Sequence, residues 1–204
     1  MSRTMIAEAF AFVLAATALL GSPGPGITAL VAVGRSFPRR AAVRFYGAMQ
    51  LGLAIAAAVS VAGLTGVLSA FPVLQTVLMI LATIYLLWLA WTIASAPVGG
   101  TVIGDAPGGS LTSKGAFFLG VANPKAYLAF ASLFGSFALL PSSAGLADGA
   151  LKWLLCVAVM VVVDLGWLVL GMVFGTIALS PRGERLFNIL MGTAVLGACV
   201  ATWL

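Results

Sequence analysis

The chain has 204 residues, of which 62% are hydrophobic and only 7% are charged, and its mean hydropathy is +1.18. About a quarter of the residues in a typical soluble domain are charged, so the composition excludes an ordinary soluble protein and predicts an all-α membrane protein. The formal net charge of +5 comes from basic residues in short connections between apolar runs. That placement orients a membrane protein and does not indicate binding to nucleic acid.

Six apolar runs are long enough to cross a bilayer as helices, which takes roughly 20 residues each. The connection at 96–113 is rich in Gly, Pro and Ser and predicts a loop between a first half, about 1–95, and a second half, about 114–204. We expect one transmembrane domain over 1–204, whose two three-helix halves insert with opposite orientations. The expected spans are Met5–Val33, Phe45–Ser69, Val73–Ala94, Gly115–Leu140, Leu151–Ile177 and Leu186–Leu204.

Lys and Arg are distributed unevenly between the two sides that this topology predicts. One side carries seven of them, and the other carries only Arg3 and Lys152. The positive-inside rule therefore predicts that both termini lie outside and that the first, third and fifth connections lie in the cytoplasm. The seven cytoplasmic residues are Arg35, Arg39, Arg40, Arg44, Lys114, Arg182 and Arg185.

A proline-containing segment interrupts the first span of each half. Proline removes a backbone donor and clashes with the preceding turn, and in hydrocarbon the freed carbonyls must face protein or a wet cavity. The sequence therefore predicts two broken helices, the first and the fourth, which meet at the midplane as in transporters that bind substrate there. The alternatives are a kink without function and, for the first break, a loop that separates a signal peptide from a mature domain. The segments are Ser22, Pro23, Gly24, Pro25 and Gly26 in the first span and Asn123, Pro124 and Lys125 in the fourth.

Lys125 and Asp164 lie near the middle of the fourth and fifth spans. Because a mid-span lysine costs about 2.5–3.5 kcal/mol on insertion scales, we expect Lys125 to face the bundle interior and to pair with Asp164. The pair is either a structural lock between two helices or a site for a zwitterion or for proton exchange. Asn123 adds an amide, and the half-helix N-termini after Pro25 and Pro124 favour an anionic group such as a carboxylate.

Four further polar or aromatic residues lie within the spans. Gln50 in the second span and Trp167, one turn from Asp164, are candidates to line a substrate cavity. We expect Glu8 at the outer interface and Asn188 in an interhelical hydrogen bond. Small residues at four-residue spacing predict close helix packing and would allow a homodimer without requiring one. These are Ala48/Gly52/Ala56, Gly171/Gly175 and Thr193/Gly197.

The cysteines and the lack of histidine limit the chemistry further. Cys156 and Cys199 lie inside apolar runs and form no CxxC pair. We therefore expect both to be buried as small hydrophobic side chains and to take no part in thiol-redox or metal-relay chemistry. With no histidine, proton coupling would have to use a carboxylate or water. No cofactor and no bound metal are expected.

At this point the chain resembles a known family, the LysE-type translocators, which contains lysine exporters and homoserine/threonine exporters. The resemblance covers essentially the whole chain and implies a six-span bacterial inner-membrane protein, not an enzyme, that exports amino acids or related metabolites using an ion gradient. Gly26 stands where the family often has Asn, and the third connection is nearly uncharged, so lysine, threonine and homoserine stay open as substrates. The matching residues are Ser22-Pro23-Gly24-Pro25, Asn123-Pro124-Lys125, Gly47-x-x-Gln50-x-Gly52, Asp164 and Leu186–Gly197.

The leading hypothesis is a secondary exporter of a small amino acid or similar zwitterion, working by alternating access around the two breaks. A cation or metal exporter is the alternative, disfavoured because the sequence offers no Cys or His cluster and only one mid-span carboxylate. A membrane enzyme would need a reactive pair that the sequence lacks. The expected partners are the small-molecule substrate and the lipid bilayer. The expected substrate-binding residues are Ser22, Pro23, Gly24, Pro25, Gly26, Gln50, Asn123, Pro124, Lys125, Asp164 and Trp167.

Overall fold

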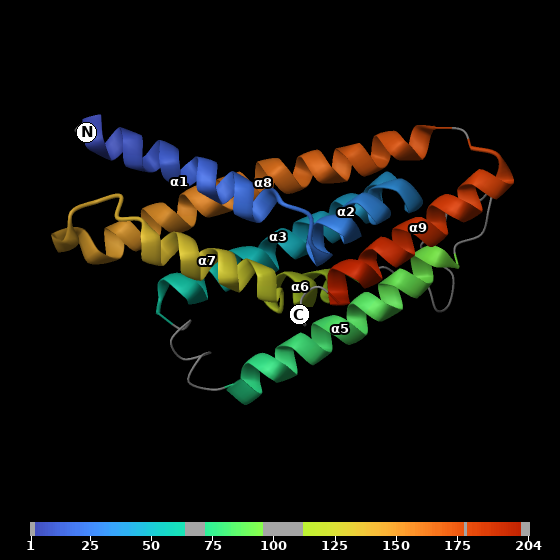
Figure 1. Ribbon diagram of the computed structural model, residues 1–204, viewed down its shortest axis with the longest axis horizontal. Helices are drawn as coiled ribbons and strands as arrows, with labels where there is room; N and C mark the ends of the chain where they lie inside the picture. The colour runs from blue at the N-terminus through green and yellow to red at the C-terminus, as the bar shows by residue number, and fades with distance from the viewer. Residues whose placement is uncertain (1–2, 64–71, 96–111, 178, 201–204) are drawn as a thin grey trace.

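The computed structural model describes residues 3–63, 72–95, 112–177 and 179–200, and every regular element in them is helical. The helices run back and forth along one long axis, with both breaks near the middle of the molecule (Figure 1). The helices are α1 (Arg3–Gly21), α2 (Pro25–Ser36), α3 (Arg39–Val61), α5 (Pro72–Ala94), α6 (Ser113–Val121), α7 (Pro124–Ser136), α8 (Gly145–Thr176) and α9 (Pro181–Val200), with a 3-10 turn at Ser142–Ala144.

Both predicted helix breaks are confirmed. The axes of α1 and α2 differ by 66°, and those of α6 and α7 differ by 41°. In each case the second helix begins at a proline, Pro25 or Pro124, and the residue before it is extended: Gly24 has φ −167° and ψ −178°, and Asn123 has φ −71° and ψ 103°. A proline disfavours helical backbone at the residue before it, so the local sequence alone is enough to end one helix and start the next.

Four predicted helix bounds are wrong by several residues. The fourth span was expected to continue to Leu140, but α7 ends at Ser136 and Phe137 is extended, with φ −117° and ψ 141°. The helices α3, α8 and α9 begin at Arg39, Gly145 and Pro181, earlier than the apolar runs do. Hydropathy marks the part of a helix suited to hydrocarbon, whereas helices also extend through the polar interface. Most of the predicted loop at 96–113, and the ends of the predicted second and sixth spans, lie outside the described residues.

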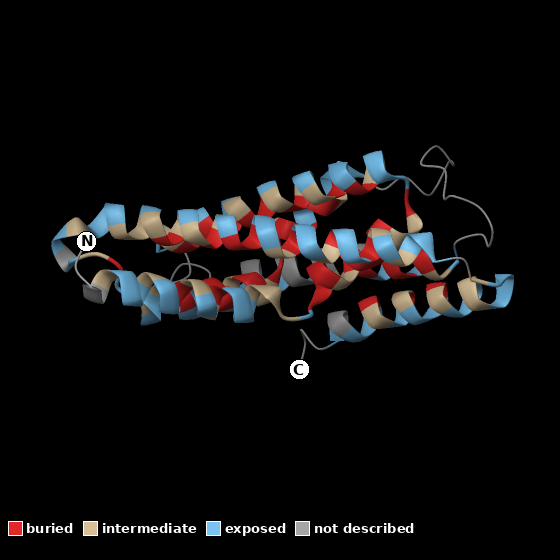
Figure 2. Cartoon of the chain, turned by 90° about the horizontal axis from the view of Figure 1, so that it is seen from above, coloured by how far each residue is buried: buried red, intermediate tan, exposed pale blue. Residues whose placement is uncertain are grey.

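The surface and the core both fit a multi-pass membrane protein. Buried residues face the inside of the helical assembly, and exposed residues cover its outer sides (Figure 2). Many of the exposed side chains are large and apolar, including Phe10, Trp91 and Val162, which are 64%, 74% and 70% exposed. In the described residues, α3 and α8 are each long and apolar enough to span a membrane, and each bent pair could form one more span. Cys156 is fully buried, as expected, and the side chain of Cys199 lies outside the described part.

Glycines bring two pairs of helices into backbone contact. In the α2–α8 pair, a Cβ at Gly34 would lie 2.5 Å from the carbonyl oxygen of Leu168, and one at Gly171 would overlap that of Val31. In the α3–α6 pair, Gly52 and Gly120 approach the facing backbone in the same way. Gly52 and Gly171 belong to the small-residue faces predicted from the sequence, and they do pack closely.

Helices α3 and α8 lie antiparallel at the centre of the fold. The hydroxyl of Tyr46 donates to the carbonyl oxygen of Val161 at 2.8 Å, and Trp153 Nε1 donates to that of Ala54 at 2.9 Å. Since position 46 faces 161 and position 54 faces 153, the two chains run in opposite directions. These hydrogen bonds fix the register of α3 on α8.

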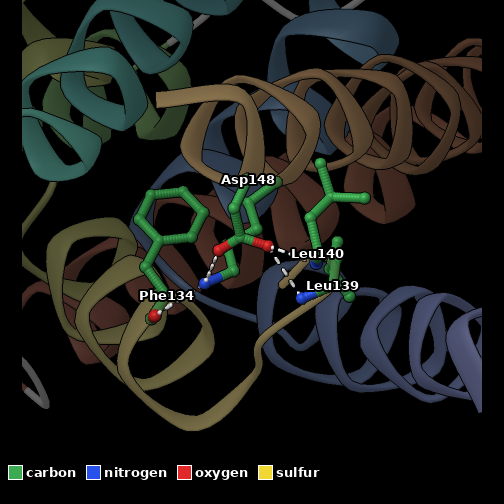
Figure 3. A network of polar contacts seen from close by, with 5 residues as sticks. Phe134, Leu139, Leu140 and Asp148 are labelled. Atoms are coloured by element: carbon green, nitrogen blue, oxygen red, sulfur yellow. Dashed lines mark hydrogen bonds and ion pairs between the residues drawn. The ribbon is translucent and has the colours of Figure 1, made fainter. Parts of the chain in front are cut away.

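A polar network joins the end of α7 to the start of α8 (Figure 3). Asp148 accepts hydrogen bonds from the backbone N–H groups of Leu139 and Leu140, both at 2.8 Å, and pairs with Lys152 at 2.6 Å. Lys152 Nζ also donates to the carbonyl oxygen of Phe134 at 3.2 Å, one of the last carbonyls of α7, which have no partner inside the helix. The network therefore satisfies backbone groups of a non-helical segment.

Candidate functional site

The two helix breaks line one pocket of about 400 Å³, counting the part that opens to solvent. Ligand pockets typically combine apolar walls with a few polar groups. This pocket has the same make-up. Its polar lining comes from Asn123, Lys125 and Asp164, and its other lining residues are Leu19, Leu20, Gly24, Gly26, Ile27, Met49, Leu53, Ala126 and Met160.

The carbonyl groups freed by the first break bind donors from other parts of the chain. Lys125 Nζ donates to the carbonyl oxygen of Ser22, and Trp167 Nε1 donates to that of Gly21 at 3.2 Å. The hydroxyl of Ser22 donates to the carbonyl oxygen of Leu19 at 2.9 Å. The C-terminal end of a helix carries partial negative charge and favours a nearby cation, so the end of α1 stabilises Lys125 at this position.

Gly24 leaves the space in which the lysine side chain crosses the first break. A Cβ at Gly24 would lie 2.7 Å from Cδ and 3.2 Å from Nζ of Lys125. Any larger side chain would therefore have to displace the lysine. Lys125 can reach the carbonyl oxygen of Ser22 in this way only because Gly24 has no side chain, although the two residues lie 101 positions apart in the chain.

The N-terminus of α2 is uncapped and borders the pocket. No side chain in the described part of the protein caps this helix, and its first residue, Pro25, has no N–H. The first complete turn is closed by the N–H of Thr28, which donates to the carbonyl oxygen of Gly24 at 2.9 Å. The N–H groups of Gly26 and Ile27 precede it and have no partner within the helix. Both residues line the pocket, so this helix end offers donors and partial positive charge to an anion.

The N-terminus of α7 is capped by Asn123, the residue just before the helix. The side-chain oxygen of Asn123 accepts a hydrogen bond from the N–H of Ala126 at 3.4 Å. The amide nitrogen of Asn123 lies near Gly26, since a Cβ there would be 3.4 Å from it. Asn123 is only 9% exposed, so its side chain connects the second break to the first.

Asp164 is bound by Gln50, not by Lys125. Gln50 Nε2 donates to Asp164 Oδ2 at 2.7 Å, and no ion pair within 4.0 Å joins Lys125 to Asp164 among the described residues. The expected direct pair is therefore wrong, because the lysine binds a backbone carbonyl at the end of α1. Lys125 and Asp164 still line the same pocket, where they place a positive and a negative group.

The eleven residues expected to bind substrate take three different positions. Gly24, Gly26, Asn123, Lys125 and Asp164 line the pocket. Gln50, Ser22 and Trp167 are not in the lining. Gln50 and Ser22 hydrogen-bond to the lining residues Asp164 and Lys125, whereas Trp167 binds the carbonyl oxygen of Gly21. The prolines Pro23, Pro25 and Pro124 lie in the breaks and are not part of the lining.

Sequence reasoning missed the apolar wall of the pocket. Leu19, Leu20 and Ile27 come from α1 and α2, Met49 and Leu53 from α3, and Met160 from α8. Apolar residues fill every span, so no sequence signal separates those that line a pocket from those that face lipid or other helices. Among the described residues, no group of three or more His, Cys, Asp or Glu side chains could hold a metal ion.

The chain matches a known protein family over most of its length. No curated protein and no solved structure matches it. The family model of the LysE type translocator matches residues 17–203, a range that includes both breaks, the pocket and all the helices after α1. The chain therefore belongs to the LysE type translocator family, whose members are transporters.

Proposed function

We propose that this protein is a secondary transporter that exports amino acids or related small zwitterions across the bacterial cytoplasmic membrane. It works by alternating access, in which the pocket between the two breaks opens to one side of the membrane at a time. Membership of a translocator family supports the transport of such compounds. The choice of zwitterion rests on the pocket itself.

The observation that carries the proposal is the arrangement of charge around one pocket. Lys125 and the uncapped N-terminus of α2 offer positive charge and donors, and Asp164 offers a carboxylate. A zwitterionic amino acid carries the complementary pair, a carboxylate and an ammonium. Ionisable residues inside a membrane are costly and mark substrate or ion pathways.

Six spans in two inverted halves complete the proposal, with both termini outside. The bent pairs α1–α2 and α6–α7, together with α3, α5, α8 and α9, would supply the six. The antiparallel packing of α3 on α8 supports this arrangement, because the second and fifth of six successive spans must run in opposite directions. The unequal distribution of Lys and Arg supports the orientation.

Counterflow in proteoliposomes tests the function. Vesicles containing the purified protein are loaded with one unlabelled amino acid and exposed outside to a trace of the labelled form, for each of the twenty in turn. We expect accumulation of at least one amino acid, abolished by Lys125→Ala. Absence of counterflow across the whole panel would reject the proposal, and exchange of metal ions in the same vesicles would favour the cation exporter instead.

A further inference from the structure

The charges in the pocket limit which amino acids it can accept. We infer that the pocket selects amino acids with neutral, apolar side chains and rejects those whose side chains are charged. This inference rests on the proposed function, since it names the substrate class of the same pocket. It follows from matching the charged groups of the lining to those of an amino acid.

The carboxylate of Asp164 has one oxygen left for a ligand. Gln50 occupies Oδ2, and Oδ1 accepts no hydrogen bond from any described residue. The side chain lies in the pocket lining and the residue is 5% exposed, so water from outside the pocket has little access to it. A buried carboxylate oxygen requires a donor, and a substrate ammonium provides one with the opposite charge.

The opposite group of the substrate has its own binding partners. An ammonium has three donors, and Lys125 uses one of them on the carbonyl oxygen of Ser22. The other two remain for a carboxylate, together with the N–H groups of Gly26 and Ile27 at the start of α2. The α-carboxylate and α-ammonium of one amino acid therefore use the whole charge of the lining.

A third charge on the substrate would have no partner. Lys125 and Asp164 are the only charged side chains among the described residues that line the pocket. The rest of the wall is made of leucine, isoleucine, methionine, alanine and glycine, apart from Asn123. A charged group that is buried against such a wall without a counter-charge is strongly disfavoured, whereas an apolar side chain gains contact with it.

Norleucine and lysine form the matched pair of substrates that tests this inference. They share the same carbon chain and differ by the terminal amine of lysine. Counterflow of wild-type protein should be at least about tenfold faster with norleucine than with lysine, and also faster than with glutamate. Equal or faster counterflow with lysine or glutamate would overturn the inference and leave the proposed function intact. Absence of counterflow with every amino acid would instead reject the proposed function itself.

A substitution in the apolar wall provides a second, independent test. Met160 lies in the lining, one helical turn before Asp164, and is 2% exposed. Met160→Glu adds the missing counter-charge, and Met160→Gln is the control with the same shape and no charge. We expect the ratio of lysine to norleucine counterflow to rise about tenfold in Met160→Glu and to stay near the wild-type value in Met160→Gln. A rise of equal size in both variants would show that charge does not cause the selectivity and would overturn the inference. If Met160→Glu does not fold, the comparison of norleucine with lysine and glutamate in wild-type protein still tests the inference.

Discussion

The first and second helix breaks both begin a new helix with proline, yet they leave their backbone groups in different states. At the first break, the axes of α1 and α2 differ by 66°, and no described side chain caps α2. The freed carbonyls there bind Lys125 and Trp167 from other helices. At the second, α6 and α7 bend by only 41°, and Asn123 caps α7 from within the break. The first break depends on distant residues, whereas the second is largely complete in itself.

The two breaks therefore contribute different chemical groups to the pocket. The first break contributes backbone groups, namely the N–H groups of Gly26 and Ile27, which line the pocket. The second presents side chains, since Asn123 and Lys125 both reach toward the first break. A pocket between them therefore combines backbone donors from one half of the chain with a cation from the other. Substitutions at the first break should mainly affect transport, and those at the second should affect stability as well.

Removing the lysine that joins the breaks should have the largest effect. In Lys125→Ala the carbonyl oxygen of Ser22 loses its donor, and the pocket loses the only positive side chain that the described residues place in its lining. We expect counterflow to fall by roughly 100-fold or more. Lys152→Ala is the control, because Lys152 also donates to a backbone carbonyl oxygen but belongs to the Asp148 network outside the pocket lining. Its protein yield is expected to fall, while its ratio of norleucine to lysine counterflow stays unchanged.

The double variant Lys125→Ala/Asp164→Asn sharpens the same prediction. If the two residues acted only as a lock, removing both charges would restore transport. Because Asp164 is held by Gln50 and Lys125 by the carbonyl oxygen of Ser22, we expect the double variant to remain inactive in counterflow. Recovery of transport to near the wild-type rate would show that neither charge contacts the substrate.

Filling the space at Gly24 should have the next largest effect. In Gly24→Ala the new Cβ would lie 2.7 Å from Cδ of Lys125, and the flexible lysine must move away. We expect counterflow to fall roughly tenfold, with little change in melting temperature, because the extended backbone at Gly24 suits any residue. Gly47→Ala is the matched control, since a Cβ there would meet no described atom within 4 Å apart from its own stretch of helix backbone. A similar loss of counterflow in both variants would contradict the prediction.

Removing the cap of the second break should lower stability by a smaller amount. In Asn123→Ala the N–H of Ala126 loses its side-chain acceptor, and loss of an N-cap costs about 1 kcal/mol. Thermal unfolding of the purified protein in detergent measures this change. Asn123→Ser retains an oxygen that can cap the helix, so we expect it to regain part of the lost stability. An unchanged melting temperature in Asn123→Ala would contradict a capping role.

The smallest effect is expected at Trp167. Trp167→Phe keeps an aromatic ring but removes the donor to the carbonyl oxygen of Gly21, and a typical hydrogen bond contributes about 0.5–1.5 kcal/mol. We expect a small decrease in melting temperature and nearly normal counterflow, because Trp167 is not among the residues that line the pocket. A complete loss of counterflow would show instead that the side chain contacts the substrate.

The two breaks could be predicted from the sequence because their cause is local. A proline restricts itself and the residue before it, so Pro25 and Pro124 reveal where the helices end. The partner of Lys125 could not be predicted in this way. Every residue has a backbone carbonyl, and nothing in the sequence distinguishes that of Ser22, whereas the carboxylate of Asp164 was the only visible candidate.

The positions of most helices could also be predicted, but not the apolar wall. Long apolar runs locate the spans because a bilayer requires them. The same apolar residues serve as lipid-facing surface, helix contact and pocket wall, so Met49, Leu53 and Met160 carry no distinguishing signal. Their assignment depends on how α3 and α8 are rotated about their axes, which only the packed structure gives.

The glycine contacts described for α2–α8 and α3–α6 set the width of the pocket. A Cβ at Gly34 would lie 2.5 Å from the carbonyl oxygen of Leu168, whereas ordinary contact begins at 3.4 Å. A single methyl group there would therefore increase the distance between α2 and α8 by about 1 Å. Those helices carry Gly26 and Ile27 on one wall of the pocket and Asp164 on another. Glycines outside the pocket lining thus set the distance between the groups on α2 and α8 that we propose bind the carboxylate and the ammonium of the substrate.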